Sequence, residues 1–174
     1  SVDLNGNSQT VGQFKNATTN AGSRRVTSAA PATLTVTPAG GTVTNTYDGC
    51  LAGALSLIKN GTGQLILAGT NTLSGSVTVS NGTLTVAAAA SLGASKEIAV
   101  AGGTLQLQTP SGITNTASLR IADGGAKVSV ATGLVVTVSL LYLGEALQAN
   151  GTYGASGSGA THIDDAHFAG SGQV

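Results

Sequence analysis

Pairs of apolar residues separated by a single residue return along this chain at a nearly constant interval. Such pairs mark strands that bury one face, because successive side chains of a strand point to opposite sides. Five pairs begin 21, 22, 21 and 21 residues apart. They are Leu34/Val36, Leu55/Leu57, Val77/Val79, Ile98/Val100 and Leu119/Ile121. Such an interval indicates stacked repeats. An antiparallel β-sandwich also has short strands, but it does not require them to recur at a constant interval.

A second apolar pair follows each of the last four pairs, and a turn signal separates the two. The second pairs are Leu65/Leu67, Leu84/Val86, Leu105/Leu107 and Val128/Val130. The turn signals are Asn60-Gly61, Asn81-Gly82, Gly102-Gly103 and Asp123-Gly124-Gly125. Residues 77–86 and 98–107 align without a gap. One repeat of about 21 residues thus contains two short strands joined by a tight turn.

This pattern predicts an all-β fold, a parallel β-solenoid (β-helix) with coils of about 21 residues. A single coil leaves strand edges open above and below, and its interior is too small to fold alone. A neighbouring coil pairs with those edges at a spacing of about 4.8 Å and extends a column of Val, Leu and Ile. We therefore expect Val77, Ile98 and Leu119 to lie directly above one another. The chain is long enough for about eight coils if every residue joins the stack.

The composition agrees with a narrow interior and excludes several classes of partner. Met and Trp are absent, aromatic residues make up 3% of the chain, and charged residues make up 8%. Seven basic and seven acidic residues balance, which excludes the basic surface that binds nucleic acid or an anionic membrane. No apolar run approaches the roughly 20 residues that span a bilayer. Because Met is absent, we interpret Ser1 as the start of a processed product or an excised piece.

The two ends depart from the repeat, which predicts three parts. Residues 1–33 form an initial coil with an excursion around Arg24-Arg25. Residues 34–149 carry the β-solenoid repeats. Residues 150–174 are rich in Gly and Ser and include Tyr153 and Phe168, which suit an irregular C-terminal cap over the last coil, or a docking segment.

One segment closely resembles the autotransporter-associated β-strand repeat. Residues 57–86 contain Lys59-Asn-Gly-Thr-Gly63, then Leu65-Ile-Leu-Ala-Gly-Thr-Asn71, and later Gly82-Thr-Leu-Thr-Val86. Residues 2–12 and 151–172 also look like segments that flank such repeats in large secreted bacterial proteins. The resemblance implies a right-handed parallel β-solenoid, export to the cell surface or medium, and a mostly structural role.

The C-terminal part contains a candidate metal site. His162, Asp164, Asp165 and His167 are four potential ligands within six residues. A strand would place His162 and Asp164 on one face and the other two on the opposite face. A turn would bring all four to Zn²⁺ or another transition metal. We favour a polar, solvated loop whose aspartates bond to their own backbone, and therefore expect neither a metal nor a cofactor.

The chain shows no recognisable catalytic constellation. A polysaccharide lyase with this kind of fold needs clustered carboxylates that hold Ca²⁺, or a base such as Lys or Arg beside them. The carboxylates here are scattered, and Glu97 and Asp123 are 26 residues apart, more than one coil. Asp123 lies near two cations, Arg120 and Lys127, and we predict a surface ion pair there.

Repeated threonines raise the possibility of an ice-binding surface. Such a surface needs threonine at the same position of consecutive coils. The expected order along one outward row is Thr35, Ser56, Thr78, Ala99, Arg120. The row loses its hydroxyl groups at the fourth and fifth coils, which argues against ice binding.

Two further motifs favour structural roles. Cys50 follows a turn, and we favour a small buried residue over a thiol that links subunits. The Gly-rich segment 59–63 lacks the spacing and the following helix of a phosphate-binding loop, so we interpret it as a corner of a coil.

The sequence therefore predicts a non-catalytic structural β-solenoid subunit of an exported, cell-surface or extracellular assembly of bacteria. Open strand edges recruit further strands, and low charge removes the usual barrier to edge association. We expect the chain to associate with itself end to end, as a homo-oligomer that forms a filament or sheath. A cell-surface glycan is a further expected partner, whereas nucleic acid and a membrane span are not expected. The alternatives are an excised stalk module of a larger adhesin and a polysaccharide-binding or lyase β-helix.

Overall fold

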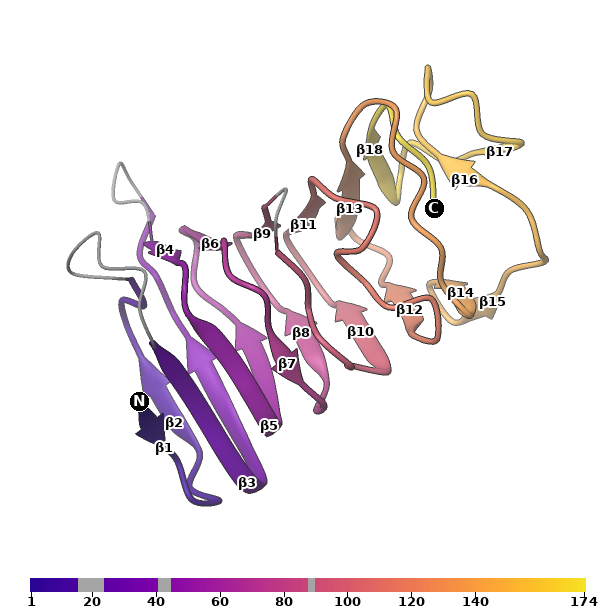
Figure 1. The fold of residues 1–174 in the computed structure, drawn as a ribbon. Helices are drawn as coiled ribbons and strands as arrows, with labels where there is room; N and C mark the ends of the chain where they lie inside the picture. The colour runs from indigo at the N-terminus through magenta and orange to yellow at the C-terminus, as the bar shows by residue number, and fades with distance from the viewer. Residues whose placement is uncertain (16–23, 41–44, 88–89) are drawn as a thin grey trace.

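The repeated apolar pairs form the strands of a parallel β-solenoid, which confirms the predicted fold class. The computed structural model describes residues 1–15, 24–40, 45–87 and 90–174. Coils of about 22 residues stack into about six turns, and Figure 1 shows the N-terminus in the coil at one end and the C-terminus at the other end. The described residues contain no helix, so none is long and apolar enough to cross a membrane.

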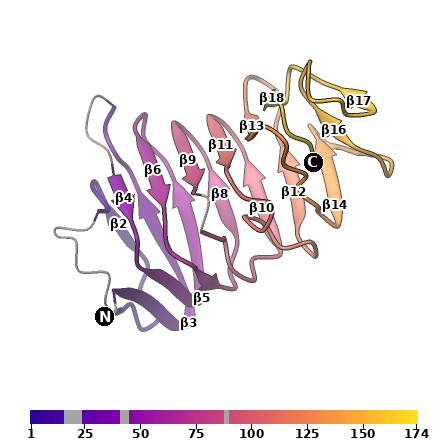
Figure 2. The ribbon, with the colours of Figure 1, turned by 45° about the horizontal axis from the view of Figure 1, so that its top comes forward.

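The larger sheet has ten strands and forms one wall of the solenoid (Figure 2). Its main order is β1-β3-β5-β8-β10-β12-β14-β15, with β2 beside β3 and β7 beside β5. All neighbours pair in parallel except β14 and β15. The strands are β1 (Val2–Asp3), β2 (Gln9–Val11), β3 (Arg25–Val36), β5 (Cys50–Lys59), β7 (Thr72–Leu73), β8 (Val77–Val79), β10 (Glu97–Val100), β12 (Ser118–Ile121), β14 (Leu140–Leu143) and β15 (Ala146–Leu147).

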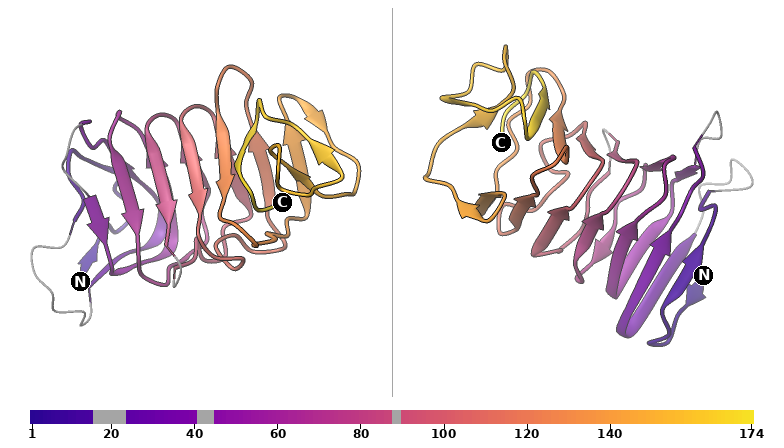
Figure 3. Two further views of the ribbon diagram at one scale, coloured as in Figure 1. Left: turned by 90° about the horizontal axis from the view of Figure 1, so that it is seen from above. Right: turned by 180° about the vertical axis from the view of Figure 1, so that it is seen from behind.

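The smaller sheet has six parallel strands in the order β18-β13-β11-β9-β6-β4. Its strands are β4 (Asn45–Tyr47), β6 (Gln64–Leu67), β9 (Thr83–Val86), β11 (Thr104–Leu107), β13 (Lys127–Val130) and β18 (Phe168–Gly170). A third sheet of two strands, β16 (Tyr153–Gly154) and β17 (His162–Ile163), lies in a lobe at the C-terminal end of the stack (Figure 3).

The interior contains two columns of apolar side chains, one on the inner face of the larger sheet and one on the inner face of the smaller sheet. Val77, Ile98 and Leu119 pair in register and are fully buried, as predicted. The column of the smaller sheet is formed by Leu65, Leu84, Leu105 and Val128. Side chains of this size fill the narrow space between the two walls and leave room for few aromatic rings.

The register of the first coils differs from the predicted spacing. Leu34 pairs with Leu57 rather than Leu55, and Leu57 pairs with Val77. Within β3, which is 12 residues long, the register against β5 also shifts part of the way along. Apolar spacing does not reveal such a shift. Lys59 continues the inward alternation of Leu55 and Leu57, so it occupies an inward position of the larger sheet.

The solenoid has about six turns rather than the eight estimated from chain length, because both ends use residues outside complete coils. At the N-terminal end, β1 and β2 share one layer beside β3. At the C-terminal end, β15 turns back on β14, and the chain passes through the lobe before it returns as β18 beside β13.

The strands β3 and β18, which belong wholly or partly to the predicted end segments, pair with strands of the central stack. β3 begins at Arg25 and pairs with β5 on both sides of residue 33. Phe168 pairs with Val128 and is 2% exposed, so it closes the end of the smaller sheet. Residues 16–23 of the predicted excursion lie outside the described residues. The division into three parts stays a prediction.

Candidate functional site

The two ends of the solenoid are the candidate functional site, because large apolar side chains reach solvent there. Among the described residues, five such side chains are exposed. They are Val2 (56%) at the N-terminal end, and Val135 (53%), Leu140 (41%), Leu147 (56%) and Ile163 (52%) at the C-terminal end. Grouped exposed apolar side chains are typical of interaction surfaces.

The N-terminal end contains an open groove of about 630 Å³, called here the N-terminal groove. Its apolar lining consists of Val2, Leu4, Val11, Phe14, Val26 and Leu34. β1 and β2 both pair with β3, and neither has a second neighbour among the described strands. The groove is therefore bordered by a strand edge whose backbone groups are available for pairing.

An aromatic pair closes the rest of this end. The ring of Phe14 packs against the ring of Tyr47, with centroids 4.3 Å apart. Tyr47 belongs to β4, the first strand of the smaller sheet. Burial, followed by the nearby Cys50 and Asp48, raises the pKa of Tyr47 to about 12. The edge of the smaller sheet is thus partly covered, whereas that of the larger sheet is open.

The C-terminal end exposes the apolar side chains of Val135, Leu140 and Leu147. β15 pairs antiparallel with β14 and ends the larger sheet, and Leu147 lies on this last strand. Val135, Leu140 and Leu147 line a hollow of about 330 Å³, together with the buried Val136 and Leu141. The larger sheet therefore ends in apolar surface on both sides.

Lys59 is buried within the stack. Its side chain is 0% exposed, and β-pairing places it between Val36 and Val79. The Nζ group donates hydrogen bonds to the backbone carbonyls of Gly61 and Asn81, each at 2.9 Å. Burial lowers the pKa of Lys59 from its ordinary value of 10.5 to about 8. The amine ties the corners of two successive coils together.

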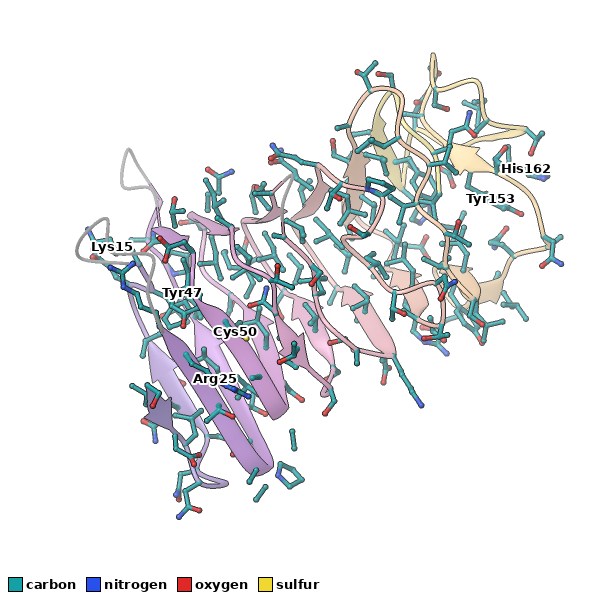
Figure 4. The ribbon with its side chains drawn as sticks, viewed as in Figure 1. Lys15, Arg25, Tyr47, Cys50, Tyr153 and His162 are labelled. Atoms are coloured by element: carbon teal, nitrogen blue, oxygen red, sulfur yellow. The ribbon has the colours of Figure 1, made fainter. Side chains whose placement is uncertain are left out.

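The four predicted metal ligands do not converge. The ring of His162 stacks on Tyr153, with centroids 4.5 Å apart (Figure 4). The ring of His167 instead bonds to Asp164, whose Oδ1 accepts from the backbone N–H of Ala166. Among the described residues, no group of three or more His, Cys, Asp or Glu side chains is placed to hold a metal ion.

His167 connects the C-terminal lobe to the body of the solenoid. Its Nδ1 lies 2.8 Å from Asp164 Oδ2, and its Nε2 lies 3.1 Å from Asp123 Oδ1 in the turn after β12. The His167 side chain is 11% exposed. Burial tends to raise the pKa of Asp164, but the hydrogen bonds from His167 and from the backbone outweigh it and lower that pKa below its usual 3.8. These contacts anchor the lobe.

The predicted ion pair of Asp123 with Arg120 or Lys127 is wrong. Arg120 lies on the outward face of β12, and its Cζ is 3.7 Å from the ring centroid of Tyr142 on the neighbouring strand. Lys127 donates to the backbone carbonyl of Asp165. Stacking of coils brings Arg120 beside a residue 22 positions later, and this neighbour is not visible in the local sequence.

Glu97 and Asp123 do not form a pair of acids. Glu97 begins β10 and pairs with Ser118, the first residue of β12. Asp123 follows the far end of β12. The two carboxylates therefore lie at opposite ends of neighbouring strands, an arrangement unsuited to a shared substrate bond.

The outward threonine row is interrupted earlier than predicted. Thr35 pairs with Ile58, not Ser56, and Ile58 pairs with Thr78. The cause is the register between β3 and β5, in which Leu34 pairs with Leu57. An apolar side chain thus replaces a hydroxyl group in the second coil of the row.

The remaining motifs lie in structural positions. Cys50 begins β5 and is half-buried rather than buried, with its Sγ 3.7 Å from Thr72 Oγ1. Residues 59–63 join β5 to β6 at a corner of the coil, as predicted.

The contact of His167 is not apparent from local motifs, whereas the inward position of Lys59 is. The His167–Asp123 contact spans 44 residues and depends on how the lobe folds back. Lys59 has one sequence signal, because it continues the alternation of Leu55 and Leu57 on the inward side of β5.

Residues 57–86 match the family model described as passenger-associated-transport-repeat. The match begins within β5 and ends with β9, so it covers more than one coil of the stack. The segment and its β-solenoid fold are consistent with an autotransporter passenger repeat, which confirms the predicted resemblance. Searches of curated proteins and of solved structures found no match.

Proposed function

Because a passenger-type repeat lies within a β-solenoid, we propose that this chain is a non-catalytic structural module of an exported, cell-surface or extracellular assembly. Copies of the module associate through the ends of the solenoid and extend into a filament or sheath.

A structural role is supported by the contacts that the charged and titratable side chains make within the fold. The Lys59 amine holds two corners together, and His167 with its two carboxylates anchors the lobe. Arg120 is stacked on Tyr142. Lys59, Arg120 and His167 are thus engaged in contacts between coils or between the lobe and the stack.

The distribution of exposed apolar side chains carries the proposal of end-to-end association. The described part of the chain exposes large apolar side chains at the two ends of the stack. The larger sheet also has an open edge at β1 and β2. A strand edge next to an apolar groove is a template for further strands, because pairing satisfies the backbone while the groove is buried.

Sedimentation velocity over a range of concentrations, with electron microscopy of the same samples, tests the association. We expect large species and regular fibres for the chain, and a shift to single chains for Leu147→Lys. Thr78→Lys, which places the same charge on the outward face of a central coil, is the matched control and should assemble like the parent chain. A monomer at all concentrations would exclude self-association and leave the stalk alternative, in which further coils of a longer chain cover the same ends.

Export is tested in the cells that produce the chain. We expect an antibody to the folded solenoid to label intact cells or the culture medium, and external protease to remove the label from intact cells. Labelling that requires permeabilised cells would contradict export.

A further inference from the structure

Two successive corners of the stack contain the same dipeptide, Asn-Gly, in the same local geometry. They are Asn60-Gly61 and Asn81-Gly82, which follow β5 and β8. In each, the backbone N–H of the glycine donates to Oδ1 of the preceding asparagine, at 2.8 Å for Gly61 and 2.7 Å for Gly82. Both asparagines are exposed. The backbone nitrogen of each glycine therefore lies beside a side-chain amide that solvent can reach.

This arrangement suits a reaction of the chain with itself. A backbone nitrogen that has lost its proton can attack Cγ of the preceding asparagine, and glycine obstructs the attack least because it has no side chain. The new N–C bond closes a five-membered succinimide, while the bond from Cγ to the side-chain nitrogen breaks and that nitrogen takes up a proton and leaves as ammonia. Water then opens the ring and leaves aspartate or isoaspartate. No oxidation or reduction takes place.

The buried amine of Lys59 distinguishes the two corners. Loss of the proton from the nitrogen of Gly82 leaves a negative charge, which the peptide group shares with the carbonyl oxygen of Asn81. Lys59 Nζ donates to that oxygen at 2.9 Å, whereas it lies 3.4 Å from the carbonyl oxygen of Asn60. A cation aimed at the atom where charge develops lowers the cost of forming that charge, above all in a site shielded from water. The amine thus activates Gly82 more strongly than Gly61.

Other asparagines have surroundings that hinder the reaction. Gly6, which follows Asn5, donates its N–H to Ser28 Oγ at 3.0 Å instead. Asn71 is 2% exposed, and its Nδ2 donates to two backbone carbonyls. A nitrogen directed elsewhere, or an amide held away from solvent, loses the orientation that the attack requires. The surroundings of Asn81 therefore favour the reaction more than those of Asn5 or Asn71.

We propose that Asn81 is a site of spontaneous deamidation, in which Lys59 activates the backbone nitrogen of Gly82, and that Asn60 reacts more slowly by the same route. The substrate is the chain itself, and the co-reactant is water. The inference does not depend on the proposed self-association or export.

The reaction gives the buried amine an acidic partner. When water opens the succinimide at the former backbone carbonyl of Asn81, the main chain continues through Cγ and the carbonyl carbon becomes a free carboxylate. The oxygen that Lys59 already contacts then belongs to that carboxylate, and a hydrogen bond between charged groups is stronger than one to a neutral carbonyl. The chain as a whole, which has no net charge, becomes acidic.

Peptide mapping by mass spectrometry, after incubation of the parent chain at pH 7, tests the site. The peptide that contains Asn81 should gain the mass difference between an amide and a carboxyl group. In the folded chain we expect Asn81 to convert about tenfold faster than Asn60. In urea, where Lys59 no longer contacts either corner, the two asparagines should convert at similar rates. Equal rates in the folded chain, or an Asn81 that stays unchanged, would overturn the inference.

Removal of the amine provides a second test. Lys59→Met should slow the conversion of Asn81 about tenfold and affect Asn60 less, because the contact with Asn81 is the shorter one. Lys96→Met, at an exposed lysine, is the matched control and should convert like the parent chain. Circular dichroism and thermal unfolding check that both variants fold. An unchanged rate at Asn81 in a folded Lys59→Met variant would contradict activation by Lys59.

The pH dependence of the parent chain separates activation by charge from a structural role of Lys59, and it needs no variant. Both asparagines should convert faster as the pH rises, because hydroxide removes the amide proton. Burial lowers the pKa of Lys59 to about 8, so the amine loses its activating charge above that pH. The ratio of the rates at Asn81 and Asn60 should therefore fall toward one between pH 7 and pH 9. A ratio that stays constant over this range would show that the charge of Lys59 plays no part.

Discussion

At the residue scale, the interior of this solenoid tolerates a charged side chain because the backbone corners supply its bonding partners. Lys59 occupies a position that is apolar in the neighbouring coils, between Val36 and Val79. Its amine reaches past the column to carbonyls of two corners. The long aliphatic stem packs within the column while the amine is hydrogen-bonded, which offsets the cost of burying a charge.

Burial of Lys59 makes stability depend on pH. The unfolded chain keeps its proton up to pH 10.5, whereas the folded chain releases it near pH 8. The unfolded state therefore binds more protons between these values, and the free energy of unfolding should rise from pH 8 toward pH 10. Urea titrations at pH 7.5, 9 and 10 measure the slope. Lys59→Met should abolish the rise, and Lys96→Met, at an exposed lysine, should keep it. A parent chain without the rise would contradict this account.

Tyr47 has the opposite effect at higher pH. Its pKa of about 12 lies above the ordinary 10.0, so the unfolded tyrosine ionises first and the folded state retains the proton. The free energy of unfolding should therefore fall between pH 10 and pH 12. Tyr47→Phe should reduce this fall, measured by the same titrations, while Tyr142→Phe on the outward face should not. Equal slopes for the two variants would show that burial of Tyr47 is not responsible.

At the scale of the element, the corners determine how closely coils stack. Gly103 has a φ of +69°, and a Cβ atom there would lie 2.3 Å from the carbonyl oxygen of Gly82 in the preceding coil. Gly124 has a φ of +85°, but a Cβ atom there would meet nothing within 4 Å. The two glycines share the left-handed backbone conformation and differ in the approach of the neighbouring corner.

This difference predicts unequal costs of substitution. Gly124→Ala should destabilise by about 1 kcal/mol through backbone strain alone. Gly103→Ala should cost about 1–3 kcal/mol more, because the corner of the preceding coil must move. Chemical unfolding of both variants measures the difference. Equal losses would mean that the corners have room to separate.

The C-terminal lobe depends on its carboxylate–imidazole contacts. The lowered pKa of Asp164 means that the folded chain keeps this carboxylate ionised at a pH where the unfolded chain protonates it. Stability from this group is therefore present above about pH 3.8 and lost as the pH falls below it. Asp164→Asn should flatten the acid side of the stability profile, while Glu97→Gln, at an exposed carboxylate, should not. An unchanged profile for Asp164→Asn would remove Asp164 from the anchor.

At the scale of the whole molecule, each coil contacts its immediate neighbours, so stability is nearly additive along the stack. The terminal coils have a neighbour on one side and should open first. Amide hydrogen exchange is expected to be slowest in β8 to β11 and faster in β1, β2 and β15. Under conditions of assembly the end strands should become protected as well. Uniform protection in the single chain would contradict this gradient.

The fold of the central coils could be predicted from the sequence because every requirement for them is local. Alternating apolar residues define the inward face of each strand, and Asn-Gly or Gly-Gly marks each turn. Equal coil length then places Val77, Ile98 and Leu119 in one column. The motif in residues 57–86 carries the family resemblance for the same reason, since one repeat contains its whole pattern.

Contacts between coils and at the ends of the stack, by contrast, depend on the tertiary structure and could not be predicted from the sequence. The register of β3 against β5 decides which residues are neighbours without changing the apolar alternation, so it places Ile58 in the threonine row and Lys59 beside Val36. The return of the chain as β18 brought His167 to Asp123 over 44 residues. A repeating pattern specifies the layer that it repeats. Where the repetition stops, long-range packing selects the partners, and in this protein those places are the ends through which we propose that it associates.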